Sequence, residues 1–560
     1  MLRNFSFFSI FLISLNVHAF ITVGTDAACD MNNIATANLD GDADIRVTNQ
    51  IVRTERFTID ASKTITGGFD SCFDAENFIQ SQTRTKWEGN NLGITLDLGI
   101  LAGNPITVTL NGFEFFNGNS VPAQTSDAGF INVIGATNVF MLNTEFHDNS
   151  GKKGGAIQLT DAGASLALIT TNIHNNSANN LGGGIYCENG KVTIYSGSAI
   201  HHNLGAVGGG IYANNCQVIL RSGEILNEFL TTKGIYFNTS NGVGGGIAMF
   251  SGSHLTLEGT LIHPAAIKGN RATMGGGIYA DGDNTTVEAY NAQINGNFAN
   301  SGGGIYITEN ANFTMYRLNG SCWDDDHCSE ISENQVTDAN AKGGAVVFDE
   351  PSTGSISQTL FKNNLAPSAA AIYIKTATLR LEGNIFTHNS QQTGPFASTE
   401  LFKIVGGGTN FTFLYNTVNY NEVNSIFALA ANENITVANS ILWNAATDIL
   451  TISGNPNLGS VIFNCNTVNE DTSLQNTINN HNHIIADVNS LFIDNQTNNY
   501  HLKANSGAID RCDESILQSQ RNDFNDKPRG VDNVSDFNIF FIYDAGAYEY
   551  NDIIFKHGFE

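Results

Sequence analysis

Residues 173–185 read IHNNSANNLGGGI, and this stretch contains both halves of a repeat that recurs along most of the chain. The first half is an aliphatic or aromatic residue, two variable residues and Asn, as in residues 173–176. The second half is a glycine-rich turn that leads into an apolar residue, as in residues 182–185. A repeat of this length predicts a solenoid, in which each copy is one coil stacked on the next.

The two phrases recur in a constant phase. The apolar residue and the Asn of the thirteen copies of the first phrase are Phe116 and Asn119, Phe146 and Asn149, Ile173 and Asn176, Ile200 and Asn203, Ile235 and Asn238, Ile267 and Asn270, Ile294 and Asn297, Ile331 and Asn334, Phe361 and Asn364, Phe386 and Asn389, Phe413 and Asn416, Ile441 and Asn444, and Val461 and Asn464. The second phrase occupies residues 154–157, 182–185, 208–211, 244–247, 275–278, 302–305 and 343–346, with a degenerate copy at 369–372. So many copies argue against an accidental Gly- and Asn-rich tract.

The chemistry of the repeat favours strands over helices. We expect the Ile or Phe to point into a core, where its burial stabilises the fold by about 1.5–3 kcal/mol. We expect the Asn to lie at a corner, where its side chain tolerates an unusual backbone conformation and bonds the Asn of the neighbouring coils. The Gly residues allow a tight turn and close backbone approach. The predicted fold is a single-stranded, right-handed parallel β-helix of thirteen or more rungs with capping segments at both ends.

Composition supports this fold and excludes some functions. The chain has 57 Gly and 8 Pro, and only 14% of its residues are charged, which is too few for the polar faces of a helical protein. The formal net charge is −27, and such an acidic surface repels nucleic acid and anionic lipid. We therefore expect no nucleic-acid partner.

The predicted organisation has five parts. Residues 1–19 read as a signal peptide, because Arg3 precedes a short apolar run and residues 17–19 (Val-His-Ala) offer a small-residue cleavage site. Residues 20–110 form N-terminal capping rungs, 111–465 the β-helix repeats, 466–550 a C-terminal closing segment and 551–560 a tail. No later segment has the ~20 apolar residues of a membrane-spanning helix, so we expect no transmembrane segment in the mature chain.

The eight cysteines are candidates for disulfides, since an even number in an exported chain favours bridges. Cys29 and Cys72 bracket the first segment, Cys187 and Cys216 follow successive glycine turns, Cys322 and Cys328 bracket a short loop, and Cys465 and Cys512 lie in the C-terminal part. CxxC spacing is absent, which argues against a zinc ribbon. The sequence does not establish the pairing.

The paired phrases resemble those of the polymorphic outer-membrane proteins, as in residues 146–149 followed by residues 154–157. The ends of the chain resemble bacterial secreted "choice-of-anchor" proteins, through Gly67–Asp70 between Cys29 and Cys72 and through residues 506–510 and 544–550. These resemblances imply a secreted or bacterial cell-surface, outer-membrane-associated β-helix with an adhesive role.

An enzyme is the alternative, because parallel β-helices often degrade acidic polysaccharides. A hydrolase of this fold needs carboxylates on neighbouring rungs, and a lyase needs a basic residue, usually with calcium-binding carboxylates. The best carboxylate cluster, Asp324–His327, falls between two cysteines in a predicted projecting loop. We expect no catalytic residue and no cofactor, apart from weak Ca²⁺ binding.

His147, His174 and His201 each follow the inward apolar residue in three successive repeats. They are predicted to form an exposed column at strand spacing, which is close enough for two imidazoles to share a metal. The other interpretation is an outward polar ladder, because Lys268 and Asn295 occupy the same phase in later repeats. The sequence thus predicts a monomeric, non-catalytic protein that presents a surface for adhesion or recognition of cell-surface glycans or proteins, with a polysaccharide lyase or glycoside hydrolase as the alternative.

Overall fold

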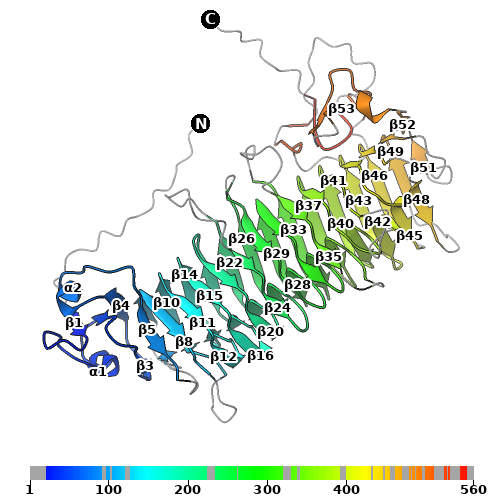
Figure 1. The fold of residues 1–560 in the computed structure, drawn as a ribbon. Helices are drawn as coiled ribbons and strands as arrows, with labels where there is room; N and C mark the ends of the chain where they lie inside the picture. The colour runs from blue at the N-terminus through cyan, green and yellow to red at the C-terminus, as the bar shows by residue number, and fades with distance from the viewer. Residues whose placement is uncertain are drawn as a thin grey trace, which may run out of the picture.

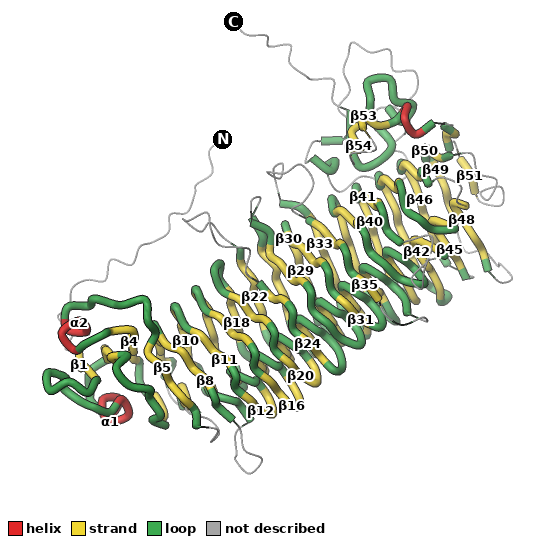
Figure 2. Tube along the Cα trace, in the orientation of Figure 1, coloured by secondary structure: helices red, strands yellow, loops and turns green. Residues whose placement is uncertain are grey.

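The computed structural model places the chain as one long rod of stacked parallel strands (Figure 1). It describes residues 20–550 apart from 91–95, 101–103, 120–126, 223–233, 261–262, 319–328, 337, 339–340, 391–398, 431–432, 445–447, 454–460, 470–477, 481, 486, 495–498, 510–511, 513–521, 526–527 and 530–542. The fold is the predicted right-handed parallel β-helix. Each rung contributes one strand to each of three sheets, here called A, B and C, as the tube in Figure 2 shows.

Sheet A has 17 strands. They are β1 (Phe20–Val23), β2 (Asp44–Thr48), β4 (Lys63–Phe69), β7 (Ile106–Asn111), β10 (Thr137–Leu142), β14 (Ser165–Ile169), β18 (Lys191–Ile194), β22 (Gln217–Arg221), β26 (His254–Glu258), β29 (Thr286–Tyr290), β33 (Asn312–Tyr316), β37 (Thr353–Ser357), β40 (Thr378–Glu382), β43 (Asn410–Leu414), β46 (Asn434–Ala438), β49 (Val461–Asn464) and β51 (Ile478–Asn480).

Sheet B has 15 strands. They are β5 (Thr85–Glu88), β8 (Phe113–Phe116), β11 (Glu145–His147), β15 (Asn172–His174), β19 (Ala199–His201), β23 (Ile235–Tyr236), β27 (Ala265–Lys268), β30 (Ala292–Asn295), β34 (Glu330–Ser332), β38 (Leu360–Lys362), β41 (Ile385–Thr387), β44 (Thr417–Asn419), β47 (Ile441–Leu442), β50 (Thr467–Val468) and β52 (His483–Ile484).

Sheet C has 14 strands. They are β3 (Phe57–Ile59), β6 (Leu96–Leu98), β9 (Ile131–Val133), β13 (Ile157–Leu159), β17 (Ile185–Glu188), β21 (Ile211–Asn214), β25 (Ile247–Phe250), β28 (Ile278–Asp281), β32 (Ile305–Thr308), β36 (Val346–Phe348), β39 (Ile372–Lys375), β42 (Glu400–Val405), β45 (Ser425–Leu429) and β48 (Asp448–Ile452).

Short strands also pair in the connection from sheet B to sheet C. They are β12 (Ser150–Lys153), β16 (Ser177–Leu181), β20 (Leu204–Val207), β24 (Thr239–Ser240), β31 (Phe298–Ala299) and β35 (Gln335–Val336). Near the C-terminus, β53 (Phe492–Asp494) and β54 (Asn499–Leu502) form an antiparallel pair beside the 3-10 helix η2 (Val488–Ser490). The described helices are short, and none has the length and hydrophobicity needed to cross a lipid bilayer.

A buried asparagine ladder follows the corner after sheet B. The side-chain oxygen of Asn203 accepts two hydrogen bonds from Asn176 on the preceding rung, one from its backbone N–H and one from its side-chain amide. The side-chain amide of Asn203 in turn donates to the carbonyl of Ile173, the inward residue of that preceding rung. The other asparagines of the ladder repeat this pattern. The eight asparagines predicted for this ladder all lie in it with at most 1% of their surface exposed: Asn149, Asn176, Asn203, Asn238, Asn270, Asn297, Asn334 and Asn364. The ladder continues through Asn389 and Asn421 to Asn444.

The backbone conformation at this corner differs from our expectation. The left-handed residue is the one before the ladder Asn, as with Asp148 at φ 54° and Asn175 at φ 53°. The Asn itself is not in the left-handed region; its role is hydrogen bonding, because both of its side-chain groups would otherwise be buried without partners.

Four of the thirteen predicted copies are placed wrongly, at least in part. Ile441 takes an outward position, because Leu442 is the residue in register with the buried Val418. Phe116 points outward, because Phe115 is the residue in register with the buried Phe146, and Gly118 takes the corner position. Asn416 lies in a second ladder at the corner between sheets A and B, which also includes Asn384 and Ser440. Asn464 ends β49 and lies in neither ladder. In each case the phrase matched a strand of different register, since apolar alternation is common to all three sheets.

The glycine turns occupy the corner before sheet C. The first Gly of each turn is left-handed, for example Gly244 at φ 65°. The second cannot carry a side chain, because a Cβ on Gly245 would lie 2.3 Å from the carbonyl oxygen of Gly276. Backbones of successive rungs therefore pass close together at this corner.

The N-terminal end of the rod is closed by chain outside the regular rungs. At the N-terminal end, α1 (Ile34–Leu39) buries Ile34 and Ala37 against the first rung, and α2 (Cys72–Glu76) is tied to Cys29 by a disulfide. Disulfides also join Cys187 to Cys216, on successive rungs, and Cys465 to Cys512. The predicted Cys322 and Cys328, the Asp324–His327 loop, the signal peptide and the tail lie outside the described residues.

Candidate functional site: the histidine column on sheet B

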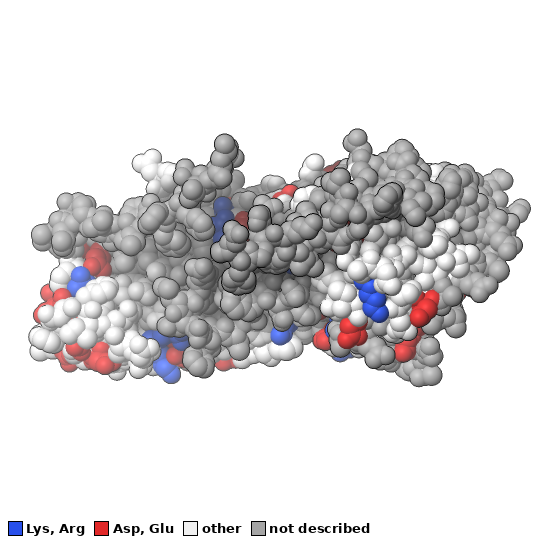
Figure 3. All heavy atoms as spheres, turned by 90° about the horizontal axis from the view of Figure 1, so that it is seen from above, with Lys and Arg blue, Asp and Glu red and all other residues white. Residues whose placement is uncertain are grey.

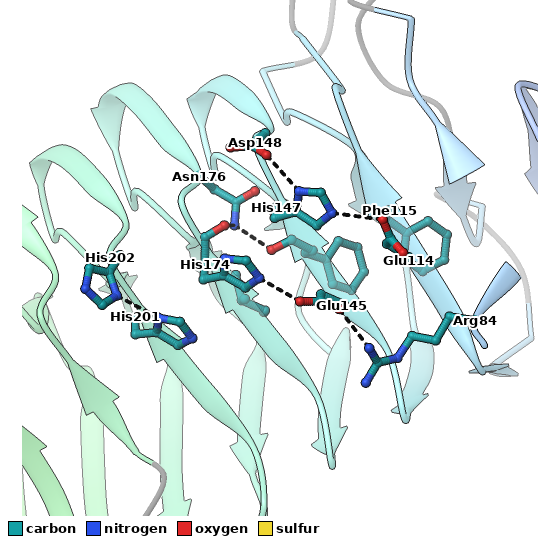
Figure 4. Close-up of polar contacts among 12 residues, drawn as sticks. Arg84, Glu114, Phe115, Glu145, His147, Asp148, His174, Asn176, His201 and His202 are labelled. Carbon is teal, nitrogen blue, oxygen red and sulfur yellow. Dashed lines mark hydrogen bonds and ion pairs between the residues drawn. The ribbon is translucent and has the colours of Figure 1, made fainter. Parts of the chain in front are cut away.

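His147, His174 and His201 occupy the same outward position on β11, β15 and β19. Strand alternation explains this placement, because the residue before each histidine is buried in the core: Phe146, Ile173 and Ile200 are all 0% exposed. The register extends the column to Phe116 on β8 and Tyr236 on β23. We call these five residues the histidine column, and Figure 4 shows its three histidines.

The rings of the histidine column stack along the rod. Ring centroids are 5.5 Å apart for Phe116 and His147, 5.4 Å for His147 and His174, 5.0 Å for His174 and His201, and 4.7 Å for His201 and Tyr236. The ring planes are within 14° of parallel. Because each ring covers its neighbour's face, the column presents ring edges and ring nitrogens to its surroundings.

Two carboxylates reach the imidazoles from the preceding strands. Glu114 Oε1 lies 3.2 Å from His147 Nε2, and Glu145 Oε1 lies 2.8 Å from His174 Nε2 (Figure 4). Glu145 is also paired with Arg84 NH1 at 2.7 Å. The hydrogen bond from His174 lowers the pKa of Glu145 below its ordinary value, which outweighs the opposing effect of burial, and Arg84 lowers it further.

The left-handed corner residues supply further groups beside the column. Asp148 Oδ2 lies 2.8 Å from His147 Nδ1, so both nitrogens of this imidazole contact a carboxylate. A carboxylate only accepts, so both contacts are hydrogen bonds when both ring nitrogens carry protons. Two rungs on, the corner residue is His202, and its Nδ1 lies 2.8 Å from His201 Nδ1.

Exposed apolar groups surround this histidine pair. The ring of Phe237 is the next corner residue after His202 and is 49% exposed, while Leu204 is 43% exposed. The rings of His202 and Phe237 have centroids 5.4 Å apart. The column therefore changes from a carboxylate-paired end at His147 to an aromatic end at Tyr236.

The sequence predicted the column but not its carboxylates or His202. Glu114 and Glu145 each stand one residue before an inward residue, Phe115 or Phe146. A Glu two residues before an outward position could therefore have indicated a carboxylate that reaches the histidine of the next rung. Among the described residues, the one set of three or more His, Cys, Asp or Glu side chains with donor atoms within 4.8 Å of one another is Asp26, Cys29 and Cys72, and its two cysteines form a disulfide. A metal shared along the column stays a prediction.

Further along the rod, the chain's own closing segment covers the same corner and the outward face of sheet B. Tyr500 donates to or accepts from Thr387 at 2.6 Å, and the backbone N–H of Ala547 donates to Thr417 at 3.0 Å. Leu360, Ile385 and Ile441 occupy there the outward position that Glu114 and Glu145 occupy in the early rungs, and they pack in the core beneath the segment. The outward face of sheet B is therefore polar in the early rungs, and apolar where the closing segment covers it.

A second row of rings lies on sheet C, but it is internally paired. Tyr279 and Tyr306 have ring centroids 5.7 Å apart and are each 7% exposed. The hydroxyl of Tyr306 donates to Asp349, which also accepts contacts from Lys342 at 3.8 Å and Lys375 at 3.6 Å. Burial raises the pKa of both tyrosines, and the carboxylates raise it further, Asp281 chiefly for Tyr279 and Asp349 chiefly for Tyr306. Such a neutralised, covered cluster fits a structural role.

Charged side chains elsewhere on the described surface are mixed in sign. On the face of the rod shown in Figure 3, acidic and basic side chains intersperse near both ends. The net charge of −27 is thus not gathered there into one field of a single sign among the described residues.

No protein-family model matches this chain, and no curated protein is significantly similar to it in sequence. The resemblance to surface β-helix families therefore rests on the motifs of the repeat and of the two ends of the chain, and it stays a prediction.

Proposed function

We propose that this chain is an exported, non-catalytic β-helix that binds a cell-surface glycan or protein through the early rungs of sheet B. The observation that carries the proposal is the division of this face. The chain's own closing segment covers it from β38 onward, whereas the early rungs present the histidine column with its carboxylates and with the exposed Phe237 and Leu204.

Rigidity supports a recognition role. The outward side chains are fixed by stacking on each other and by a backbone whose corner is held by the buried asparagine ladder. A surface ordered before binding loses little conformational entropy when a ligand docks. Aromatic rings with adjacent hydrogen-bonding groups are also the residue types enriched at interaction hot spots.

The arrangement gives less support to catalysis. Both column carboxylates already contact imidazoles, and Glu145 is also held by Arg84, so neither is poised as an acid and base pair around a water or a sugar bond. The polysaccharide-degrading alternative is therefore tested in the same experiment as binding.

The test is a binding screen of the purified mature chain, expected to be a monomer, against arrayed glycans and intact cells. The variant His147→Asn, His174→Asn, His201→Asn removes the imidazoles while keeping an outward polar residue, as Asn295 does at the same position of β30. The matched control is Lys268→Ala, Asn295→Ala, Ser332→Ala, which alters the corresponding positions four rungs further along sheet B.

We expect saturable binding that the imidazole variant weakens at least about tenfold and the control leaves unchanged, in line with the loss of central interface groups. Equal binding by both variants would place recognition elsewhere. Release of reducing ends or unsaturated sugars from pectin, alginate or glycosaminoglycans would replace the proposal with the enzyme alternative.

A further inference from the structure

Two imidazole nitrogens lie within hydrogen-bond distance of each other at the corner after β19. His201 is the last residue of β19, and His202 follows it in the left-handed conformation with φ 52°. The two Nδ1 atoms are 2.8 Å apart, and the ring planes are at 83°. The left-handed turn produces this approach, because it brings the side chain of the corner residue back toward its neighbour.

Two imidazole nitrogens at this distance share either a hydrogen, in an N–H···N hydrogen bond, or a metal ion that both of them ligate. Elsewhere in the column a carboxylate meets the imidazole: Glu114 for His147 and Glu145 for His174. In the rung before His201, the residue in register with those two glutamates is Asn172. The register position that carries a glutamate on β8 and β11 thus carries a neutral amide on β15.

The spacing selects the kind of metal. With metal–imidazole bonds of about 2.0–2.1 Å, two nitrogens 2.8 Å apart subtend an angle of about 86° at the metal. A tetrahedral ion such as Zn²⁺ would need the nitrogens about 3.3 Å apart. An angle near 90° suits square-planar or tetragonal ions, and Cu²⁺ binds nitrogen ligands more tightly than the other divalent ions of the first row.

We propose that Nδ1 of His201 and Nδ1 of His202 form a two-nitrogen site for Cu²⁺. The site goes beyond the recognition role, since it holds whether or not the early rungs bind a glycan or protein. Stacking on His174 and on Tyr236, at 5.0 and 4.7 Å, fixes the ring of His201. The ring of His202 lies against Phe237, and its exposure leaves room for water or an outside ligand to complete the coordination.

Copper titration of the full metal-free chain tests the site, followed by calorimetry and electron paramagnetic resonance. The wild type should bind one Cu²⁺ with two coupled nitrogen ligands at this site. His202→Asn should weaken that binding by at least about tenfold, because even the loss of an outer-shell partner typically has this effect. Asn tolerates the left-handed conformation, and Asn175 adopts it with φ 53° at the same position one rung earlier, so the variant should fold.

His201→Asn should weaken Cu²⁺ binding equally. The matched control His147→Asn, whose ring stacks on Phe116 and His174 two rungs before His201, should leave it within twofold. Circular dichroism melting of each variant separates loss of the site from loss of the fold. Unchanged Cu²⁺ binding by His202→Asn would overturn the proposal. Loss of binding in His147→Asn with retention in His202→Asn would move the metal to the column. Zn²⁺ binding as tight as that of Cu²⁺ would contradict the angular argument.

Discussion

The side-chain oxygen of Asn297 accepts two hydrogen bonds from Asn270, one from its backbone N–H at 3.0 Å and one from its side-chain amide at 3.1 Å. Asn270 stands in the same relation to Asn238, and its amide also donates to the carbonyl of Ile235 at 3.0 Å. Each ladder side chain thus closes the polar groups of three successive rungs. This is why the chain repeats Asn at a buried position, where an isolated amide would be costly.

Asn270→Ala should destabilise the rod by about 3 kcal/mol. It removes the acceptor of the Asn238 backbone N–H, one of the two acceptors of the Asn238 side-chain amide, and a donor to the carbonyl of Ile235. The measurement is the midpoint of denaturant unfolding followed by circular dichroism. The control is Asn434→Ala, which removes an exposed Asn bonded to Asn410 and should shift the midpoint little. Similar shifts for both variants would contradict a special role for the ladder.

Gly245→Ala should be at least as damaging, by about 3 kcal/mol, because the added Cβ would lie 2.3 Å from the carbonyl oxygen of Gly276 and 2.6 Å from the backbone nitrogen of Arg271. Backbone atoms of a stacked rung cannot move aside without disturbing the ladder of hydrogen bonds. The comparison is Gly41→Ala, whose Cβ would have no atom within 4 Å. Thermal melting of the two variants measures the difference, and equal melting temperatures would refute the steric argument.

The sequence predicted the fold because the repeat is imposed by backbone geometry at two corners. The buried corner needs Asn for its hydrogen bonds, and the corner where rungs pass close together needs Gly. Both residues therefore recur even where the outward side chains differ from rung to rung. Register was harder to predict. Phe116 and Asn416 fit the phrase by sequence, but Phe115 points inward and Asn416 lies in the other ladder, since apolar alternation alone does not distinguish one sheet from another.

The candidate site was predicted in part, for a related reason. His147, His174 and His201 were found because they keep one phase relative to the inward residue. Glu114 and Glu145 were missed, because their contact with an imidazole is diagonal across two rungs and depends on the repeat length. The approach of His202 to His201 depends on a left-handed corner that the phrase alone assigned to the wrong residue.

Glu145 should make stability depend on pH. Its pKa is lowered in the folded chain, so its carboxylate contributes stability that is fully present above the ordinary pKa of a glutamate and is lost as the pH falls through the folded value. Glu145→Gln should therefore be less stable than the wild type at pH 6, by no more than about 1 kcal/mol, with the two converging toward pH 3. Denaturation midpoints of both proteins across this range test it. If the difference in midpoint between the two proteins is the same at pH 3 and pH 6, ionisation of Glu145 does not contribute to stability.

Arg529 should control the attachment of the closing segment. Its guanidinium donates to the carbonyls of Gly546 and Ala547 at 3.2 and 2.9 Å. It also pairs with Glu549 at 3.6 Å and lies 4.3 Å from the ring centroid of Tyr415, which belongs to the rungs of the β-helix. Both charged side chains are 2% exposed, so removing the cation leaves a buried carboxylate without its counter-charge, at a cost of about 3–5 kcal/mol.

Arg529→Met should therefore release the closing segment while the rungs stay folded. Limited proteolysis should cleave the C-terminal part faster than in the wild type, and circular dichroism should retain the strand signal of the rod. Adding Glu549→Leu should restore part of the resistance, because it removes the stranded charge. The control is Arg221→Met, whose ion pair with Glu258 is 43% and 34% exposed and should matter little. If Arg529→Met resists protease as well as Arg221→Met does, the segment is held by its apolar contacts and by the Cys465–Cys512 disulfide, and the buried ion pair is dispensable.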